Sequence, residues 1–253
     1  MSRVQSIERA FAVLSALTDG PSGVTEVAER VDLPKSTAAR MLASLAREGA
    51  VEQVPGETRY RLGPRIEDLA TGLRTTRNLI AVARPHLAEL AASLGEAAGL
   101  SIPDGDEVHY VDQVDSPTPH PVGIRDWTGS RVPMHAVSSG LVFLAHRPAG
   151  ALDRYLAEPL PPLTDRTVTD PAEIRERLRA TALAGYAWVH DEFAVGISSV
   201  AAGVADPGGE VVAAVHVHGP SYRFPPAGRE AALGLVVATS AAKISRSLRQ
   251  ALG

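Results

Sequence analysis

The stretch Leu33-Pro34-Lys35-Ser36-Thr37-Ala38-Ala39-Arg40-Met41-Leu42 holds the features that decide the fold of the first part of the chain. Apolar residues recur in and after it at helical spacing, at Ala38, Met41, Leu42 and Leu45. This spacing predicts a helix with one apolar face, from about Lys35 to Glu48. Pro34 fits the first turn of such a helix, where a missing N–H costs nothing, and Gly49 fits its C-terminal cap.

Two shorter helices and a hairpin surround this helix in the sequence. Upstream, helical spacing predicts a helix that ends before Asp19, with an apolar face made of Ile7, Ala10, Phe11, Leu14 and Leu17. A second short helix is expected over residues 25–31, with Thr25 as its N-cap. After Gly49, alternating residues on either side of the turn Pro55-Gly56-Glu57 predict a hairpin over residues 51–62. Helix, helix, turn, helix and hairpin in this order are typical of a winged helix-turn-helix.

A helical linker joins this first part to a larger second part. Helical spacing returns after Pro64, and a further helical stretch holds Leu79, Val82, Leu87 and Leu90. Pro85 is expected near a helix start or at a kink. We therefore predict a winged helix-turn-helix domain over residues 1–63, a helical linker over 64–78, and a larger domain over 79–253.

The larger domain alternates predicted strands and helices. Two hairpins are expected to pair residues 98–102 with 107–114 and residues 196–205 with 210–218. Helices are expected over residues 139–146, 171–184 and 226–252, the second of them with Asp170 and Glu173 as a capping box. An antiparallel sheet flanked by helices is the predicted architecture, which makes the whole chain an α+β protein.

Composition and charge exclude several classes of protein. The chain has no cysteine, so it has no disulfide, no thiolate zinc site and no cysteine nucleophile. It has no apolar run of ~18 residues, and its start lacks the layout of a secretory signal, so we expect a cytoplasmic protein without membrane contact. The net charge of -4 belongs to residues 78–253, because residues 1–77 carry 11 basic against 10 acidic residues. Nothing in the sequence indicates a cofactor.

The polar side of the predicted helix suits contact with DNA. The polar residues in its first turns, where a recognition helix enters the major groove, are Lys35, Ser36, Thr37 and Arg40. We expect Ser36 and Thr37 to contact phosphates and Arg40 to read a base. Arg59 and Arg61 share one face of a wing strand and are expected to reach the minor groove or the flanking backbone. Any one of these residues alone is equally consistent with a solvated surface charge, and it is the order of the elements that favours DNA binding.

Six segments resemble the IclR (isocitrate lyase regulator) family of bacterial transcription regulators. In the first part they are Val4-Gln5-Ser6-Ile7-Glu8-Arg9-Ala10, Leu33-Pro34-Lys35-Ser36-Thr37-Ala38-Ala39-Arg40 and Tyr60-Arg61-Leu62-Gly63. In the second part they are Arg131-Val132-Pro133-Met134-His135-Ala136, Gly196-Ile197-Ser198-Ser199-Val200-Ala201-Ala202 and the strand from Val211 to Pro220. The resemblance implies a GAF-like effector-binding domain, a dimer or dimer of dimers, and transcription control by a small metabolite.

The resemblance also implies an effector pocket in the larger domain. The positions that match the family's pocket are Met134, Ser138, Ser139, Ile197, Ser199, His216 and His218. The loop before Met134, with Ile124 and Trp127, is expected to supply an apolar wall. His216 and His218 replace the small hydroxyl residues common in the family, and two imidazoles suit an organic or aromatic acid as effector.

His216 and His218 can be interpreted in three ways from the sequence alone. They lie two residues apart on a predicted strand, so their side chains project to one face, opposite Val215 and Val217. They are expected either to contact a ligand, to pack as ordinary sheet histidines, or to bind a metal. In the last case His135 or Glu192 would be the third ligand.

An enzyme and a ligand-sensing adaptor are the alternatives to a DNA-binding regulator. The chain contains no G-x-S-x-G, Walker A, dinucleotide glycine fingerprint or H-E-x-x-H motif, so no enzyme class is indicated. An adaptor would use its winged helix to contact protein, and the wing arginines argue against it. We therefore expect a regulator, and a repressor rather than an activator. Its dimer would place two recognition helices ~34 Å apart on double-stranded DNA, at a near-palindromic operator.

Overall fold

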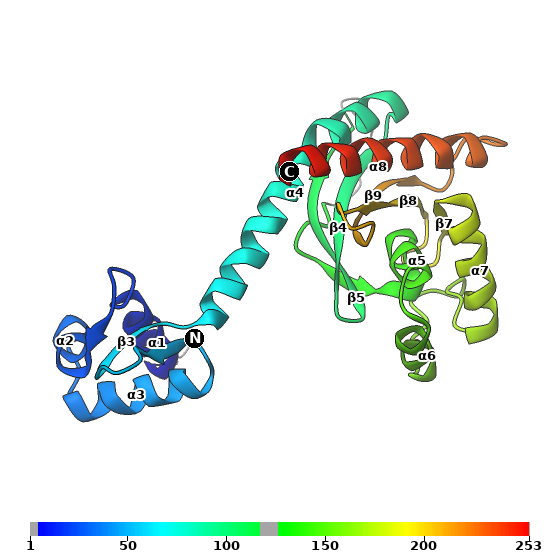
Figure 1. Cartoon of the computed structure of the whole chain (residues 1–253). Coiled ribbons are helices and arrows are strands. Elements are labelled where there is room, and N and C mark those ends of the chain that lie inside the picture. The colour runs from blue at the N-terminus through cyan, green and yellow to red at the C-terminus, as the bar shows by residue number, and fades with distance from the viewer. Residues whose placement is uncertain (1–4, 117–125, 253) are drawn as a thin grey trace. The chain divides into compact units, whose positions relative to one another are not determined.

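The structure, a computed structural model, describes residues 5–116 and 126–252 (Figure 1). The chain divides into two units, residues 1–77 and 78–253, each with its own core, and the division falls inside the long helix α4 (Pro64–Leu94). Pro85 lies inside this helix, so the two helical stretches expected from the sequence are one. No helix in the described ranges combines the length and apolar composition needed to cross a membrane.

The first unit is the predicted winged helix-turn-helix. Its elements are α1 (Gln5–Ser15), β1 (Ser22–Gly23), α2 (Val24–Arg30), α3 (Lys35–Arg47), β2 (Val51–Gln53) and β3 (Arg59–Leu62). The strands form an antiparallel sheet in the order β1-β3-β2. Leu42 of α3 is fully buried in a core with Val13, Leu17, Val27 and Val51. Gly49 follows α3 with a φ of 72°, the left-handed conformation that suits glycine after a helix.

The buried face of α1 differs from the predicted one. Of the predicted face, Leu17 is buried and Leu14 packs against the same core, but Ile7 is 56% exposed and Phe11 66% exposed. Val13, which was not predicted, is fully buried. Apolar residues occur on more than one side of this helix, so the spacing of apolar residues alone does not show which of them are buried. Packing against the fully buried side chains of the core places the Val13 side inward and leaves Ile7 and Phe11 on the surface.

The cap of α2 also differs from the prediction. The helix begins at Val24, so Thr25 lies inside it rather than before it. The backbone N–H of Gly23 donates to Oε2 of Glu26 at 2.9 Å, which satisfies a donor at the helix start without a hydroxyl side chain.

A six-stranded antiparallel sheet forms the centre of the second unit. Its strands are β4 (Ala97–Asp104), β5 (Glu107–Val114), β6 (Arg131–Pro133), β7 (Ala187–His190), β8 (Ile197–Ala205) and β9 (Val211–Pro220). Their order in the sheet is β6-β5-β4-β9-β8-β7. Both predicted hairpins are confirmed as the pairs β4–β5 and β8–β9. The short edge strands β6 and β7 were not predicted.

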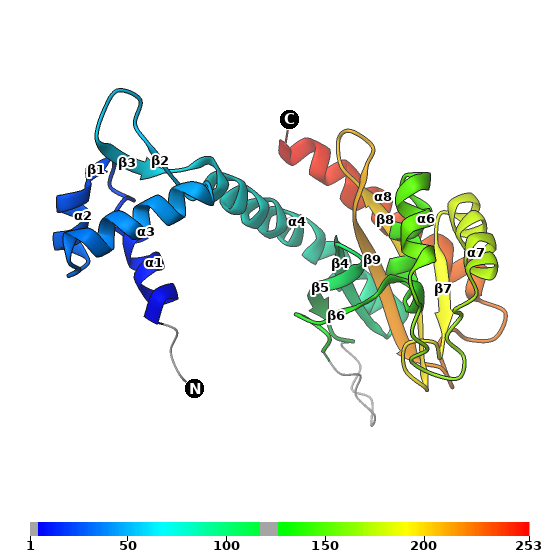
Figure 2. The same cartoon turned by 90° about the horizontal axis from the view of Figure 1, so that it is seen from below.

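Helices cover both faces of this sheet (Figures 1 and 2). The second half of α4 and α8 (Glu230–Leu252) share one apolar cluster with β4, β8 and β9. The other face is covered by α5 (Ser138–Ala145), α6 (Ala149–Ala157) and α7 (Pro171–Ala184). Asp170 caps α7 by accepting from the N–H of Ala172 at 2.7 Å. Helix α6 was not predicted, and α8 begins at Glu230 rather than at residue 226.

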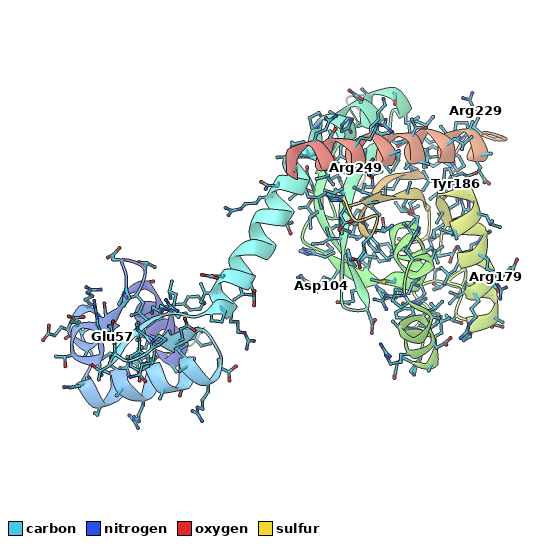
Figure 3. The ribbon with its side chains drawn as sticks, in the orientation of Figure 1. Glu57, Asp104, Arg179, Tyr186, Arg229 and Arg249 are labelled. Carbon is cyan, nitrogen blue, oxygen red and sulfur yellow. The ribbon has the colours of Figure 1, made fainter. Side chains whose placement is uncertain are left out.

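Close packing fixes α8 on the sheet. A Cβ atom at Gly234 would lie 2.3 Å from the ring of Tyr186, a residue labelled beside α8 in Figure 3. Only glycine allows the helix to approach that ring so closely.

The core of the first unit gives a prediction about stability. We expect Leu17→Ala to destabilise the first unit by about 2–5 kcal/mol, because it removes a buried side chain and leaves a cavity. Phe11→Ala should change the free energy of unfolding by less than about 0.5 kcal/mol, because that ring is exposed. Urea unfolding of the full chain followed by circular dichroism measures both. A larger loss in Phe11→Ala than in Leu17→Ala would contradict the exposed position of Phe11.

Candidate functional site

The polar residues at the start of α3 lie on the surface of the first unit. Lys35, Ser36 and Arg40 are exposed, and Thr37 is half-buried. Ala38 and Leu42, on the opposite side of the helix, are fully buried. Within the described part of the chain, the side chains of these four polar residues have no hydrogen-bond or ion-pair partner. They can therefore contact an external ligand without breaking any internal hydrogen bond or ion pair.

The wing arginines are exposed but have internal partners. Arg61 on β3 pairs with Glu52 on β2 at 2.6 Å, and its side chain is 51% exposed. The guanidinium of Arg59 donates to the carbonyl of Pro21. Any external contact of these two residues would have to replace or share these bonds.

A concave surface of about 430 Å³ joins the start of α3 to the wing. Lys35 and Arg59 both line it, and the remaining lining residues are Gly23, Val24, Thr25, Glu26 and Thr58. Two basic side chains from segments far apart in the sequence therefore face one depression. Thr25, Glu26 and Thr58 were not predicted as site residues, because a surface shared by a helix start and a wing has no sequence signature.

A small cavity lies in the second unit between the sheet and the start of α5. Its volume is about 30 Å³, which is room for about one water molecule. The residues that line it are Tyr110, Trp127, Val137, Ser138, Phe193, Ile197, Ser199, His216 and His218. These side chains combine aromatic surface with a few polar groups, the usual make-up of a small-molecule site.

His216 and His218 form the polar side of this cavity. They project from the same face of β9, with ring centroids 5.6 Å apart and ring planes inclined by 25°. The rings of Tyr110 on β5 and His216 form a T-shaped contact, with centroids 5.0 Å apart. A Cβ atom at Gly99 on β4 would lie 2.5 Å from Nε2 of His216. The imidazole therefore occupies space that only a glycine on the neighbouring strand leaves open.

Burial keeps both imidazoles neutral. It lowers the pKa of His216 well below 6.5, with a further contribution from His218. It also lowers the pKa of His218 to about 4, against the opposing effect of Asp115 and Asp126. Nδ1 of His216 and Nε2 of His218 are buried and have no hydrogen-bond partner among the described residues. A neutral imidazole has one donor and one acceptor, so the pair retains unused hydrogen-bonding capacity.

Five of the seven predicted effector residues line the cavity: Ser138, Ile197, Ser199, His216 and His218. The hydroxyls of Ser138 and Ser199 are hydrogen-bonded at 2.9 Å, which links α5 to β8. Met134 and Ser139 do not line it. Met134 is fully buried in the apolar cluster under α5, where its backbone lies against Gly140. Ser139 is buried with its hydroxyl unpartnered, one residue from the cavity along α5.

The apolar wall of the cavity comes partly from residues that were not predicted. Trp127, which was expected there, contacts Phe193 edge to face with centroids 5.1 Å apart. Phe193 belongs to the loop between β7 and β8, and no pattern in the sequence marked it. Tyr110 is on β5 and Val137 directly precedes α5. Ile124 lies outside the described residues.

The residues proposed as a third metal ligand are bound elsewhere. Nε2 of His135 donates to the carbonyl of Pro161 at 3.0 Å, and its Nδ1 lies 3.1 Å from the hydroxyl of Tyr155. Glu192 forms a two-pronged ion pair with Arg177, with both distances 2.7 Å. Over the described ranges, no group of three or more His, Asp or Glu side chains is placed to hold a metal ion. The interpretation of the histidine pair as a metal site therefore gains no support.

The fold of the first unit and the exposed polar face of α3 define a DNA-binding protein of the winged helix-turn-helix class. Comparison with known families identifies it further. Residues 6–55 match the IclR helix-turn-helix domain, and residues 73–246 match the bacterial transcriptional regulator IclR C-terminal domain. The chain therefore belongs to the IclR family of transcription regulators, which are not enzymes.

Individual relatives agree with this assignment. A helix-turn-helix transcriptional regulator of Mycobacterium tuberculosis is 36% identical over 91% of this chain and 87% of its own length. The transcriptional repressor IclR of Escherichia coli is 30% identical over 88% of this chain and 82% of its own. A crystal structure of an IclR homologue from Microbacterium hydrocarbonoxydans complexed with 4-hydroxybenzoate superposes with a TM-score of 0.64. It is 26% identical and covers 97% of this chain and 99% of its own.

The buried histidine pair predicts a loss of stability in acid. The folded-state pKa of His218 is about 4, below the 6.5 of the exposed group, so the unfolded chain binds the proton more readily. The stability contributed by the neutral ring is complete above pH 6.5 and is lost as the pH falls towards 4. Between about pH 7.5 and about pH 5 we expect the second unit to lose about 2 kcal/mol from this group, and His216 adds to the loss.

Urea unfolding at both pH values measures this effect. His218→Gln should show a clearly smaller loss, because glutamine does not titrate. His146→Gln, which replaces an exposed histidine of the same unit, should keep the full loss. Equal acid sensitivity in all three proteins would contradict the assignment to His218.

Proposed function

We propose that this chain is a cytoplasmic repressor that binds a near-palindromic operator in double-stranded DNA as a dimer or a dimer of dimers. In this proposal its affinity for the operator changes when a small organic or aromatic acid binds in the second unit. The functional division is into a DNA-binding domain over residues 1–63, a linker over 64–78 and an effector-binding domain over 79–253. The repressor role is supported by the Escherichia coli relative, whose name describes a repressor.

The observation that carries the proposal is the set of unpaired polar residues on α3. Lys35, Ser36, Thr37 and Arg40 have no internal partner to give up, so their full hydrogen-bonding capacity is available to DNA. In our proposal Arg40 contacts a base edge while Ser36 and Thr37 contact phosphates, with Lys35 beside them on the backbone. Arg59 and Arg61 would exchange an internal partner for a phosphate, so each would contribute less net free energy.

The cavity supports an acidic effector with an aromatic or small apolar body. Neutral imidazoles can donate N–H groups to a carboxylate. Because the hydroxyls of Ser138 and Ser199 are bonded to each other, the one that accepts in that bond adds one further donor. Trp127, Phe193 and Tyr110 suit a flat apolar group. An IclR homologue has been crystallised with 4-hydroxybenzoate, which combines these features.

Ligand binding must widen this cavity. A volume of about 30 Å³ is far below that of a typical ligand site, which is on the order of 300 Å³ or more. The ligand would therefore select an open arrangement of the second unit. It can change DNA affinity only through its differential affinity for the open and closed arrangements.

A charge-matched pair of variants tests DNA binding. Arg40→Ala should weaken binding to DNA upstream of the chain's own gene by roughly 5- to 150-fold, because a base contact by arginine contributes about 1–3 kcal/mol. Arg47→Ala removes the same charge from the other end of α3 and should have a small effect. Mobility-shift titrations over a range of salt concentrations measure both. A wild-type chain without salt-dependent DNA binding would overturn the proposal and favour a protein-binding adaptor.

A second pair of variants tests the effector site. A panel of aromatic and aliphatic carboxylates that includes 4-hydroxybenzoate is screened for compounds that raise the melting temperature and release operator DNA. His216→Asn combined with His218→Gln should remove both responses to the compound that scores, and His146→Gln should keep them. The double variant should still retain operator DNA without the compound, because both histidines lie outside the first unit. A normal response from the double variant would mean that the effector binds elsewhere.

A further inference from the structure

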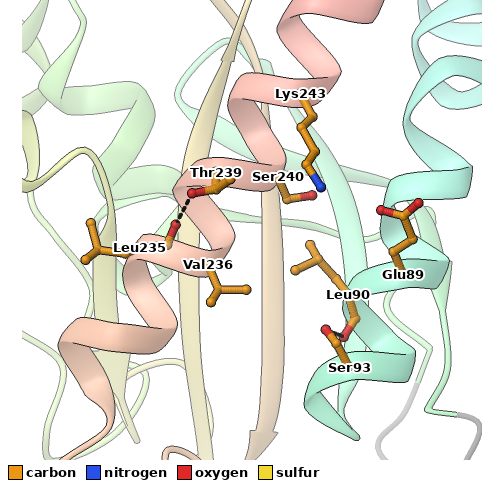
Figure 4. Close-up of a pocket in the computed structure, with 8 residues that line it drawn as sticks. All are labelled: Glu89, Leu90, Ser93, Leu235, Val236, Thr239, Ser240 and Lys243. Atoms are coloured by element: carbon orange, nitrogen blue, oxygen red, sulfur yellow. Dashed lines mark hydrogen bonds between the residues drawn. The ribbon is translucent and has the colours of Figure 1, made fainter.

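A groove of about 390 Å³ runs between α4 and α8 in the second unit, on the outside of the helix layer (Figure 4). Glu89, Leu90 and Ser93 line it from α4. The α8 side is lined by Leu235, Val236, Thr239, Ser240 and Lys243. The cavity with the two histidines lies on the other face of the sheet and shares no residue with this groove.

The surface of α8 is unusually apolar where it borders the groove. Residues 231–242 contain no charged side chain, a stretch of more than three helical turns. On this stretch Leu235 is 59% exposed and Val236 41% exposed. Helix α7, which also lies on the surface of the second unit, carries five charged residues within its 14. A surface helix that exposes leucine and valine over several uncharged turns marks an interaction site.

Charge at the groove points to a self-complementary contact. Glu89 and Lys243 are its two charged lining residues, one of each sign, on opposite walls. No ion pair joins them within the described chain, although they face each other in Figure 4. A two-fold symmetric contact uses the same surface of both copies, so every contact in it occurs twice. Glu89 of each copy would then face Lys243 of the other.

We propose that a second copy of this chain docks in this groove. The exposed face of α8 from each copy lies along the α4–α8 groove of the other. Leu235 and Val236 form the apolar centre, and Glu89 and Lys243 pair across the rim. Protein interfaces have this arrangement, with charged residues depleted at the centre and polar groups around it. A second copy is favoured over an unrelated partner because α8 supplies both the exposed apolar face that would dock and one wall of the groove that would receive it. This surface would mediate the self-association that is part of the proposed function.

Charge placed at the apolar centre tests this contact. In the full chain, Leu235→Glu with Val236→Glu should lower the particle mass in sedimentation by about two-fold, from tetramer to dimer or from dimer to monomer. Leu183→Glu serves as the control, because Leu183 is 90% exposed on α7 and lies away from the groove. It should sediment as the wild type does. Circular dichroism checks that each variant is folded.

Crosslinking decides the question if the double variant does not fold. The chain has no cysteine, so a single introduced one reacts alone. Thr239→Cys should be joined into a covalent dimer by a short bifunctional maleimide, whereas Leu183→Cys should remain monomeric on a denaturing gel. Equal crosslinking of the two would overturn the proposal.

The outcomes separate this surface from the proposed function. If the wild-type chain is an oligomer and Leu235→Glu with Val236→Glu leaves it intact, only the assignment of the interface to this groove is wrong. A wild-type chain that sediments as a monomer overturns both the groove and the self-association. The DNA-binding proposal is tested independently by Arg40→Ala.

Discussion

The burial of β9 on both faces is the constraint on which the second unit depends. The strand pairs with β4 along one edge and with β8 along the other, so its backbone groups are bonded on both sides. Val215 and Val217 face the apolar cluster shared with α4 and α8. The alternate positions His216 and His218 face the cavity. A register shift of one residue would move both imidazoles into the apolar core and both valines to the cavity, so the strand has one favourable register.

The same strand holds buried polar groups that a ligand could bond. Two buried ring nitrogens lack hydrogen-bond partners in the described residues, and each such group costs on the order of 1–3 kcal/mol. Keeping both rings neutral avoids the far larger cost of burying a charge. A ligand that bonded these nitrogens would regain part of the lost free energy. The polar groups around it would also discriminate against ligands that cannot reproduce those bonds.

Local pattern predicted most of the elements but not the details that depend on tertiary packing. Strong periodicity located α3, α7 and both hairpins, because their burial follows from one-sided apolar faces. Near the N-terminus it counted the exposed residues Ile7 and Phe11 among the buried ones and missed Val13, which lies in the core. The family resemblance, rather than periodicity, placed Met134 and Ser139 at the pocket. Neither lines the cavity, because neighbours on a short buried helix or turn point in different directions. Phe193 reaches the cavity from a loop whose path only the folded chain determines.

The sheet supplies a physical route from the cavity to the helix that leads into the first unit. Nε2 of His216 lies against Gly99 of β4, where an added Cβ atom would be only 2.5 Å from it. Strand β4 pairs with β5, where Asp112 accepts a hydrogen bond from Arg84 of α4 at 2.5 Å. Because protein interiors are close-packed, a displacement at the ring would also affect these contacts. On the other face of β9, Val215 and Val217 share their cluster with Leu87 and Leu90 of the same helix. Two sets of contacts thus tie α4 to the strands at the cavity. In the proposed function, a ligand that shifted His216 would change the free energy of both sets and so couple the cavity to α4.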